Sequence, residues 1–123
     1  MSSVPQVVLS SIAFGNSYPP YDGVSTTFNS AQLKGNGYYG YTDGLHTVSY
    51  KLINFVGIIK FQATLVQNPA STDWFDITST IVGDGSTAIT GNYFFNYSGN
   101  FVWCQALVTN FTAGNIQQVL YNT

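Results

Sequence analysis

Charged side chains are scarce in this chain. They make up 7% of its 123 residues, arginine and glutamate are absent, and the net charge is −2. Nucleic-acid binding requires clustered cations that displace the counterions of the phosphates, so three scattered lysines argue against it. A free monomer usually stays soluble through a mixed charged surface. The polar but uncharged composition is typical of a subunit of a permanent assembly or of a secreted β protein.

Cysteine and long apolar runs are also scarce. The single cysteine, Cys104, excludes an internal disulfide framework, and its place on a predicted core face indicates an unreactive packed thiol. The first residues have neither a basic start nor an apolar run of signal-peptide length. No run approaches the roughly 20 apolar residues that cross a bilayer. We therefore expect neither a secretion signal nor a membrane partner.

Strand-forming sequence, in contrast, is abundant. Of the residues, 45% are hydrophobic and 16% aromatic, which suits one domain with a core of its own. Three runs near the C-terminus, 92–97, 101–108 and 116–121, are rich in aromatic and β-branched residues and are separated by Gly/Asn turns. This pattern predicts consecutive antiparallel hairpins.

Two earlier runs alternate between apolar and polar residues. Every second residue of 46–52 is apolar, and in 57–66 Phe61 and Leu65 share the apolar face while Gln62 lies on the other. We expect Phe61 and Leu65 to be buried. In total about seven or eight strands are indicated, with turn signals roughly every 8–12 residues. The count predicts an antiparallel β-sandwich of jelly-roll type, with a closed barrel as the alternative.

The first thirty residues interrupt the strand pattern. Pro19-Pro20 favours an extended course and forbids a central strand. We interpret residues 1–30 as an extended N-terminal arm that packs on a neighbouring subunit, or as locally tucked edge strands, and residues 31–123 as the β-sandwich domain. Residues 31–34 are the one place where a helical turn is expected.

Candidate catalytic and metal-binding residues lack the partners that chemistry needs. His46 is the only histidine and has no nucleophile elbow near it, so a strand-end hydrogen bond is the expected role. Asp73 and Asp76 are expected to be loop caps or solvated charges rather than a catalytic pair. With Asp84 they lack any known calcium spacing. We expect no enzyme activity, no metal and no cofactor.

Aromatic residues outside the predicted core are the main functional signal. Such rings are enriched at protein–protein interfaces, and beside amide groups they also stack on sugars. In the run 101–108 the outward face is itself largely apolar, which fits a central strand or a subunit interface. The candidate interface residues are Tyr38, Tyr39, Tyr41, Trp74, Trp103, Gln105 and Leu107.

A series of turn and core segments supports a resemblance to a known group. In order along the chain, the segments are 34–40, 43–48, 55–57, 73–75, 91–93, 98–103 and 111–116. The series resembles small β-sandwich virion structural proteins of tailed phages of the cyanophage type, over about residues 34–121. Members of that group tend to carry Arg and Lys on the strand that corresponds to 103–108, where this chain has Gln105 and Leu107.

The resemblance implies a non-enzymatic structural subunit of a virion, as a capsid decoration, neck or tail component. Its expected partners are copies of itself and other virion proteins, and no nucleic acid. The alternative is an adhesion module, displayed on the virion, that binds a surface glycan.

Overall fold

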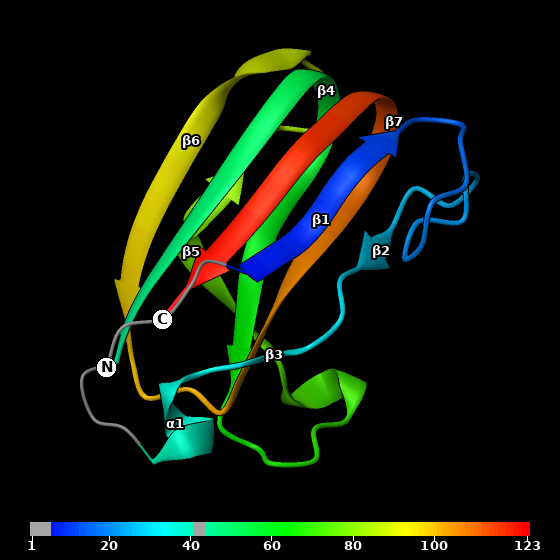
Figure 1. The fold of residues 1–123 in the computed structure, drawn as a ribbon. Coiled ribbons are helices and arrows are strands. Elements are labelled where there is room, and N and C mark those ends of the chain that lie inside the picture. Colours follow the sequence, from blue (N-terminus) through cyan, green and yellow to red (C-terminus); the bar gives the residue numbers. More distant parts are fainter. Residues whose placement is uncertain (1–5, 41–43) are drawn as a thin grey trace.

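The computed structural model describes residues 6–40 and 44–123, and most of its regular structure is antiparallel β-sheet (Figure 1). Tyr41 and Asp43 therefore lie outside the described residues. The elements are β1 (Gln6–Ala13), β2 (Phe28–Asn29), β3 (Leu33–Lys34), α1 (Asn36–Tyr39), β4 (Leu45–Thr64), the 3-10 turn η1 (Ser71–Asp73), β5 (Phe75–Val82), β6 (Ile89–Ser98) and β7 (Trp103–Asn122).

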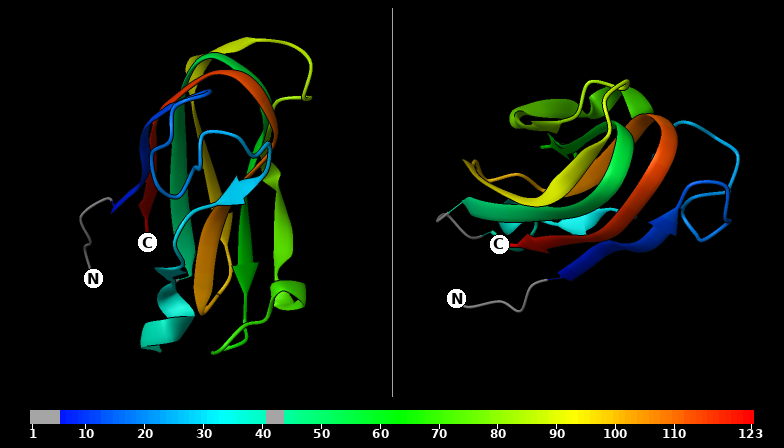
Figure 2. Two further views of the ribbon diagram at one scale, coloured as in Figure 1. Left: turned by 90° about the vertical axis from the view of Figure 1, so that its right-hand side faces the viewer. Right: turned by 90° about the horizontal axis from the view of Figure 1, so that it is seen from above.

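Two strands of 20 residues, β4 and β7, run through the whole molecule as an antiparallel pair. Both strands bend near their middle, β4 around residues 54–57 and β7 around residues 110–114. Asn54, Asn110 and Gly114 have positive φ there, and the register of the pair shifts. Each strand consequently contributes one half to each of two layers (Figure 2).

The strand order of the two layers is that of a jelly roll. In one layer, β1 pairs with the C-terminal half of β7, which pairs with the N-terminal half of β4, and β6 forms the edge. In the other layer, β2 and β3 pair with the N-terminal half of β7, which pairs with the C-terminal half of β4, and β5 forms the edge. The predicted antiparallel sandwich is confirmed.

Glycine is required where the two bends cross. Gly114 has a φ of +89°, and a Cβ at this position would collide with the backbone carbonyl of Asn54. The ring of Phe111 is fully buried beside this crossing, 5.6 Å from the ring of Phe55. The bend thus combines a close backbone approach with an aromatic plug that closes this end of the core.

The core lies between the layers and follows the period-two pattern of the strands. Val48, Tyr50, Ile59 and Phe61 are all fully buried. The expectation for Leu65 is wrong: this side chain is 63% exposed. β4 ends at Thr64, one residue before Leu65. The chain has therefore left the sheet at Leu65, and the alternation of the strand no longer directs this side chain toward the core.

The predicted hairpin series near the C-terminus is wrong in its pairing. β6 pairs with β4, and residues 99–102 carry the chain to the other layer before β7 begins. The runs 101–108 and 116–121 belong to one bent strand, β7, rather than to two strands. Gly and Asn residues indicate that the chain changes direction. They do not distinguish a hairpin turn from a passage between layers, as at residues 99–102, or from a bend within one strand, as at residues 110–114.

Residues 6–30 lie on the sandwich, as the alternative of locally tucked edge strands describes. β1 pairs with β7 as an edge strand, and Leu9 and Ile12 face the core. The following loop adds the buried rings of Tyr21 and Phe28, which pack on Phe111. The helical turn expected at residues 31–34 is also displaced, because β3 occupies Leu33–Lys34 and the turn of helix is Asn36–Tyr39.

Candidate functional site

Three of the predicted interface residues gather at one end of the sandwich. Tyr38 and Tyr39 of α1 lie near Trp103, the first residue of β7: the ring of Tyr38 is 5.0 Å from Trp103 and 5.3 Å from Tyr39. Tyr38 and Tyr39 are 39% and 47% exposed. Together with the exposed Leu65 they form a surface that we call the aromatic end.

The aromatic end encloses a shallow cavity of about 470 Å³. Leu65 and Val102 contribute apolar walls, and Gln67 contributes the polar edge. The complete lining consists of Gly37, Tyr38, Tyr39, Gly40, Leu65, Gln67 and Val102. Segments more than sixty residues apart in sequence thus form one concave surface, on which Tyr38 and Tyr39 are partly exposed.

Two glycines place α1 against the start of β7. The backbone N–H of Gly35 donates to Val102 O at 2.9 Å, and that of Gly37 donates to Phe101 O at 2.8 Å. A Cβ at Gly35 would collide with the carbonyl oxygen of Phe101, and one at Gly37 would collide with that of Asn100. The Gly-x-Gly sequence therefore permits the close backbone contact that sets Tyr38 beside Trp103.

The rings of the aromatic end are held in place by polar contacts. The indole Nε1–H of Trp103 donates to Gln67 O at 2.8 Å, which fixes the loop that follows β4. The ammonium of Lys34 lies 4.6 Å from the centre of the Tyr38 ring, within the range of a cation–π contact. The surface is therefore preorganised, which lowers the conformational entropy lost on binding.

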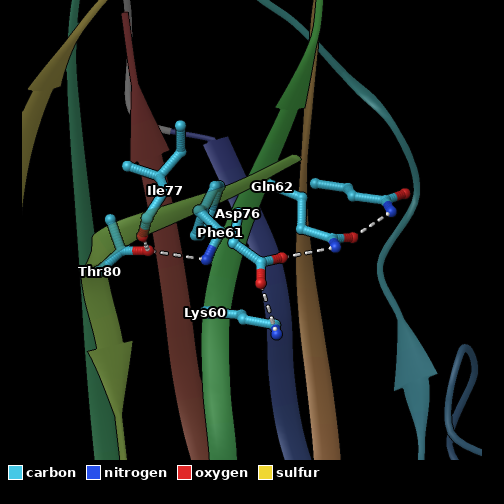
Figure 3. Close-up of polar contacts among 7 residues, drawn as sticks. Lys60, Phe61, Gln62, Asp76, Ile77 and Thr80 are labelled. Atoms are coloured by element: carbon cyan, nitrogen blue, oxygen red, sulfur yellow. Dashed lines mark hydrogen bonds and ion pairs between the residues drawn. The ribbon is translucent and has the colours of Figure 1, made fainter. Parts of the chain in front are cut away.

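Gln105 lies elsewhere, where it continues a row of polar side chains on the layer of β5. Figure 3 shows Lys60, Asp76 and Gln62 of this row. Asp76 accepts from Lys60 at 3.0 Å and from Gln62 at 2.9 Å. The amide of Gln62 accepts from Gln105 at 3.0 Å, and the amide of Gln105 accepts from Asn29 at 3.2 Å. Gln105 is only 7% exposed, and its amide forms its hydrogen bonds with other side chains of the chain.

The row also sets the charge state of Asp76. Its pKa lies below the usual value of 3.8, mainly because the Gln62 amide donates to the carboxylate and also because Lys60 does so. Lys60–Asp76 is the ion pair found within the described residues.

Leu107 and Trp74 do not line the cavity. Leu107 is half-buried on β7, beyond Gln105. Trp74 is half-buried directly after η1. Tyr41 lies outside the described residues. The seven residues therefore do not form one continuous site, and Tyr38, Tyr39 and Trp103 are the group that the fold assembles.

His46 is part of the core. The side chain is fully buried, and its ring stacks on Tyr97 with 4.7 Å between ring centres. Its Nε2 lies 2.7 Å from Gly99 O, an acceptor, so this nitrogen carries a proton, and its Nδ1 lies 2.7 Å from the Tyr121 hydroxyl. These partners are distant in sequence, so the bond is not the local one expected, and both ring nitrogens bind other parts of the fold.

Cys104 belongs to the same buried group. The Tyr97 hydroxyl donates to its Sγ at 3.2 Å, and the Tyr121 hydroxyl lies 3.6 Å from Sγ. Burial raises the pKa of the Cys104 thiol and the pKa values of both phenols. A thiol kept protonated in this way is a poor nucleophile, in agreement with the predicted packing role.

Asp73 and Asp84 lie outside the polar row and cap loops. Asp73 accepts from the backbone N–H of Ala70 at 2.7 Å. Asp84 accepts from the backbone N–H groups of Ser86 and Thr87, both at 2.8 Å, and these bonds lower its pKa to about 2. Within residues 6–40 and 44–123, no group of three or more His, Cys, Asp or Glu side chains is placed to hold a metal ion.

Comparison with protein-family models, curated proteins and solved structures found no match to this chain. In the part of the chain that the structure describes, no helix has the length and apolar character to cross a membrane.

Sequence reasoning missed the polar row and the buried histidine group. The period-two pattern places Gln62 and Gln105 correctly on outward faces. It does not reveal that they are neighbours, because that depends on the register of β4 and β7. Likewise, nothing in the sequence near His46 indicates Tyr121 as its partner.

Proposed function

We propose that the chain is a non-enzymatic structural subunit of a tailed-phage virion, a capsid decoration, neck or tail component that acts through protein–protein contacts. The aromatic end carries the proposal. Exposed tyrosines beside a tryptophan, around a concave surface with a mixed polar and apolar lining, form the kind of cluster in which interface energy concentrates. Apolar burial contributes roughly 25 cal/mol per Å² before the entropy of association is deducted.

The charge distribution and the buried histidine group agree with this role. Few charged side chains oppose the approach of an uncharged partner surface. The single histidine is used in packing, and the thiol is buried, so the groups that would serve hydrolytic chemistry are engaged in holding the fold.

The test is attachment to particles. Virions of the phage that encodes the chain, assembled without it, are incubated with purified protein and sedimented, and the bound protein is quantified. We expect wild type to bind, and the double variant Tyr38→Ala, Leu65→Ser to lose at least about tenfold in affinity, about 1.4 kcal/mol. Val24→Ser, a change at a loop residue that is 82% exposed, is the control and is expected to bind as wild type. Absence of binding by wild type would refute the proposal.

A glycan-binding adhesion module on the virion is the second candidate. The observation in its favour is that Gln67, an amide residue, lines the same cavity as the partly exposed Tyr38 and Tyr39. A glycan array with the isolated protein separates the two functions. Specific glycan binding by the isolated protein that is lost in the Tyr38→Ala, Leu65→Ser variant, while that variant still attaches to particles, would favour adhesion.

A further inference from the structure

The four edges of the sandwich differ in how they are protected. β2 and β3 have two residues each. β5 carries Asp76 and pairs with β4 through a register shift. β1 has a register shift between Val7 and Leu9 and a positive φ at Ser11. Short strands, charges and irregular backbone are the devices by which sheet edges avoid pairing with other chains.

β6 is the least protected edge, because its register shift against β4 is confined to its first residues, between Ile89 and Gly91. Its ten residues include no charged residue and no proline. Eight successive residues, from Gly91 to Ser98, pair with β4 without a shift in register. Among the described residues β6 pairs with β4 alone, and Figure 1 shows it at the margin of its layer. One side of this strand therefore presents regularly spaced backbone groups for a further strand.

We propose that two copies of the chain associate by antiparallel pairing of their β6 strands about a two-fold axis at Phe94. This register places Phe94 opposite Phe94 of the second copy, Asn92 opposite Asn96, and Tyr93 opposite Phe95. Strand 89–98 is thus complementary to itself, as an interface with two-fold symmetry requires. Aromatic pairs and amide pairs directly across strands stabilise the association of a sheet.

The pattern of exposure fits this register. Asn92, Phe94 and Asn96 are exposed on the outer face, whereas Tyr93 and Phe95 are half-buried toward the core. Residues directly opposite each other in an antiparallel pair point to the same side, so outer residues meet outer residues. Phe94 is 70% exposed, and pairing would shield its ring against that of the second copy.

A second copy of the chain is the partner that we favour for the edge of β6, because this edge has no charged side chain that would attract a partner of opposite charge. In an isologous contact a residue on the two-fold axis meets its own copy, so a charged residue there would face a like charge. β6 avoids this repulsion, whereas pairing through β5 would add Asp76 of each copy. The pairing rests on the proposed function, to which it adds contacts between copies of the chain. It uses a surface separate from the aromatic end, so an experiment can refute the pairing without refuting attachment to particles, and the reverse.

Sedimentation equilibrium tests the pairing. We expect wild type to reach twice the monomer mass of 13.4 kDa as its concentration rises. Phe94→Lys places two ammonium groups opposite each other and should weaken the dimer by about tenfold or more. Val7→Lys changes a residue that is 58% exposed on β1, the other edge of the same layer, and should leave the dimer unchanged. Circular dichroism during heating checks that all three proteins are folded.

Disulfide trapping tests the register. Phe94→Cys should give a covalent dimer under mild oxidation, because directly opposite Cα atoms lie about 4.5–5.5 Å apart. Asn92→Cys should not, because the two introduced thiols would be roughly 14 Å apart along the strands. Cys104 is buried and does not compete.

Three results would overturn the proposal: a wild type that is monomeric at every concentration, a dimer lost in Val7→Lys but kept in Phe94→Lys, or equal trapping by both cysteine variants. A protein that dimerises as expected but does not attach to particles keeps the pairing and refutes the proposed function instead.

Discussion

At the scale of single residues, Phe61 and Leu65 show how far alternation can be trusted. Both occupy the apolar face of the run 57–66, but Phe61 is fully buried between the rings of Tyr50 and Tyr121, and Leu65 is 63% exposed. We expect Phe61→Ala to lower the free energy of unfolding by about 3–5 kcal/mol, because it leaves a cavity. Leu65→Ala should change it by less than about 0.5 kcal/mol. Urea denaturation measures both, and a loss below about 1 kcal/mol for Phe61→Ala would contradict the packing.

Thr80 is the second residue with a sharply defined role. Its side chain is fully buried where β5 departs from regular pairing with β4. The hydroxyl accepts from Phe61 N–H at 2.9 Å and donates to Ile77 O at 2.6 Å (Figure 3). It therefore replaces the ladder hydrogen bonds that the irregularity removes.

Replacing Thr80 with its near-isostere tests this role. Thr80→Val keeps the shape but leaves a buried donor and a buried acceptor unpaired, each at a cost of about 1–3 kcal/mol. Thr78→Val, at an exposed position of the same strand, is the control and should be nearly neutral. Chemical denaturation that finds the two variants equally stable would show that the hydroxyl bonds contribute nothing.

At the scale of elements, the bends of β4 and β7 create the two layers. Gly114 and Gly15 have nearly the same φ, +89° and +87°, but a Cβ at Gly114 would meet the carbonyl of Asn54, whereas a Cβ at Gly15 would meet nothing within 4 Å. Comparing alanine substitutions at Gly15 and Gly114 therefore separates the free-energy cost of a positive φ from the cost of a collision between Cβ and the backbone.

We expect Gly15→Ala to cost about 1–2 kcal/mol, the penalty of a left-handed conformation. Gly114→Ala should cost clearly more, because the crossing strands would also have to move apart. The difference between the two free energies of unfolding is the quantity to measure. Equal losses would mean that the crossing of the bends is not tightly packed.

The N-terminal strand is the second element whose contribution can be measured. From the sequence, residues 31–123 are expected to fold without residues 1–30. In the structure Leu9, Ile12, Tyr21 and Phe28 all contribute to the core, which gives a reason to expect the opposite. Deletion of residues 1–30 would expose the apolar surfaces that they cover on β7.

We expect the shortened chain to lose cooperative unfolding and to bind hydrophobic dyes, while the full chain unfolds in one transition. Circular dichroism and dye fluorescence on both proteins decide the matter. A shortened chain with a native β spectrum and a sharp transition would restore the interpretation of residues 1–30 as an assembly arm.

At the scale of the whole molecule, the sequence pattern predicted which side chains of a strand point inward, but not which strands pair. Alternation identified the inward faces of β4 around Tyr50 and Phe61, because period two is a property of each strand alone. The pairing of β6 with β4 and the union of two runs in β7 depend on contacts between distant segments. The sequence near residues 110–114 contains the same Gly and Asn that a hairpin turn would use, so it does not distinguish a bend from a turn.

The candidate site was predictable to the same degree. Exposed aromatic residues identify Tyr38 and Tyr39 as surface groups, because the Gly-rich sequence around them does not continue a strand. Their meeting with Trp103 depends on the close backbone approach at Gly35 and Gly37, which only the folded chain reveals. Gln105 was correctly placed on an outward face but belongs to the polar row.

The low charge of the molecule leads to a prediction for salt. Lys60–Asp76 is the ion pair within the described residues and lies near the surface, where such pairs contribute little. Salt screens interactions between charges, and this screening does not act on the apolar burial between the layers. The melting temperature should therefore change by less than about 2 °C between low salt and 1 M sodium chloride, a shift that corresponds to well under 1 kcal/mol.

Sodium sulfate is the matched comparison for this measurement. Sulfate is excluded from protein surfaces and strengthens apolar burial, so at equal ionic strength it should raise the melting temperature well above the value in chloride. Differential scanning calorimetry at neutral pH provides both values. If sodium chloride alone shifted the transition by several degrees, electrostatic interactions would contribute more to this fold than its few charges indicate, and the view of a sandwich stabilised by apolar layers and uncharged hydrogen bonds would have to be abandoned.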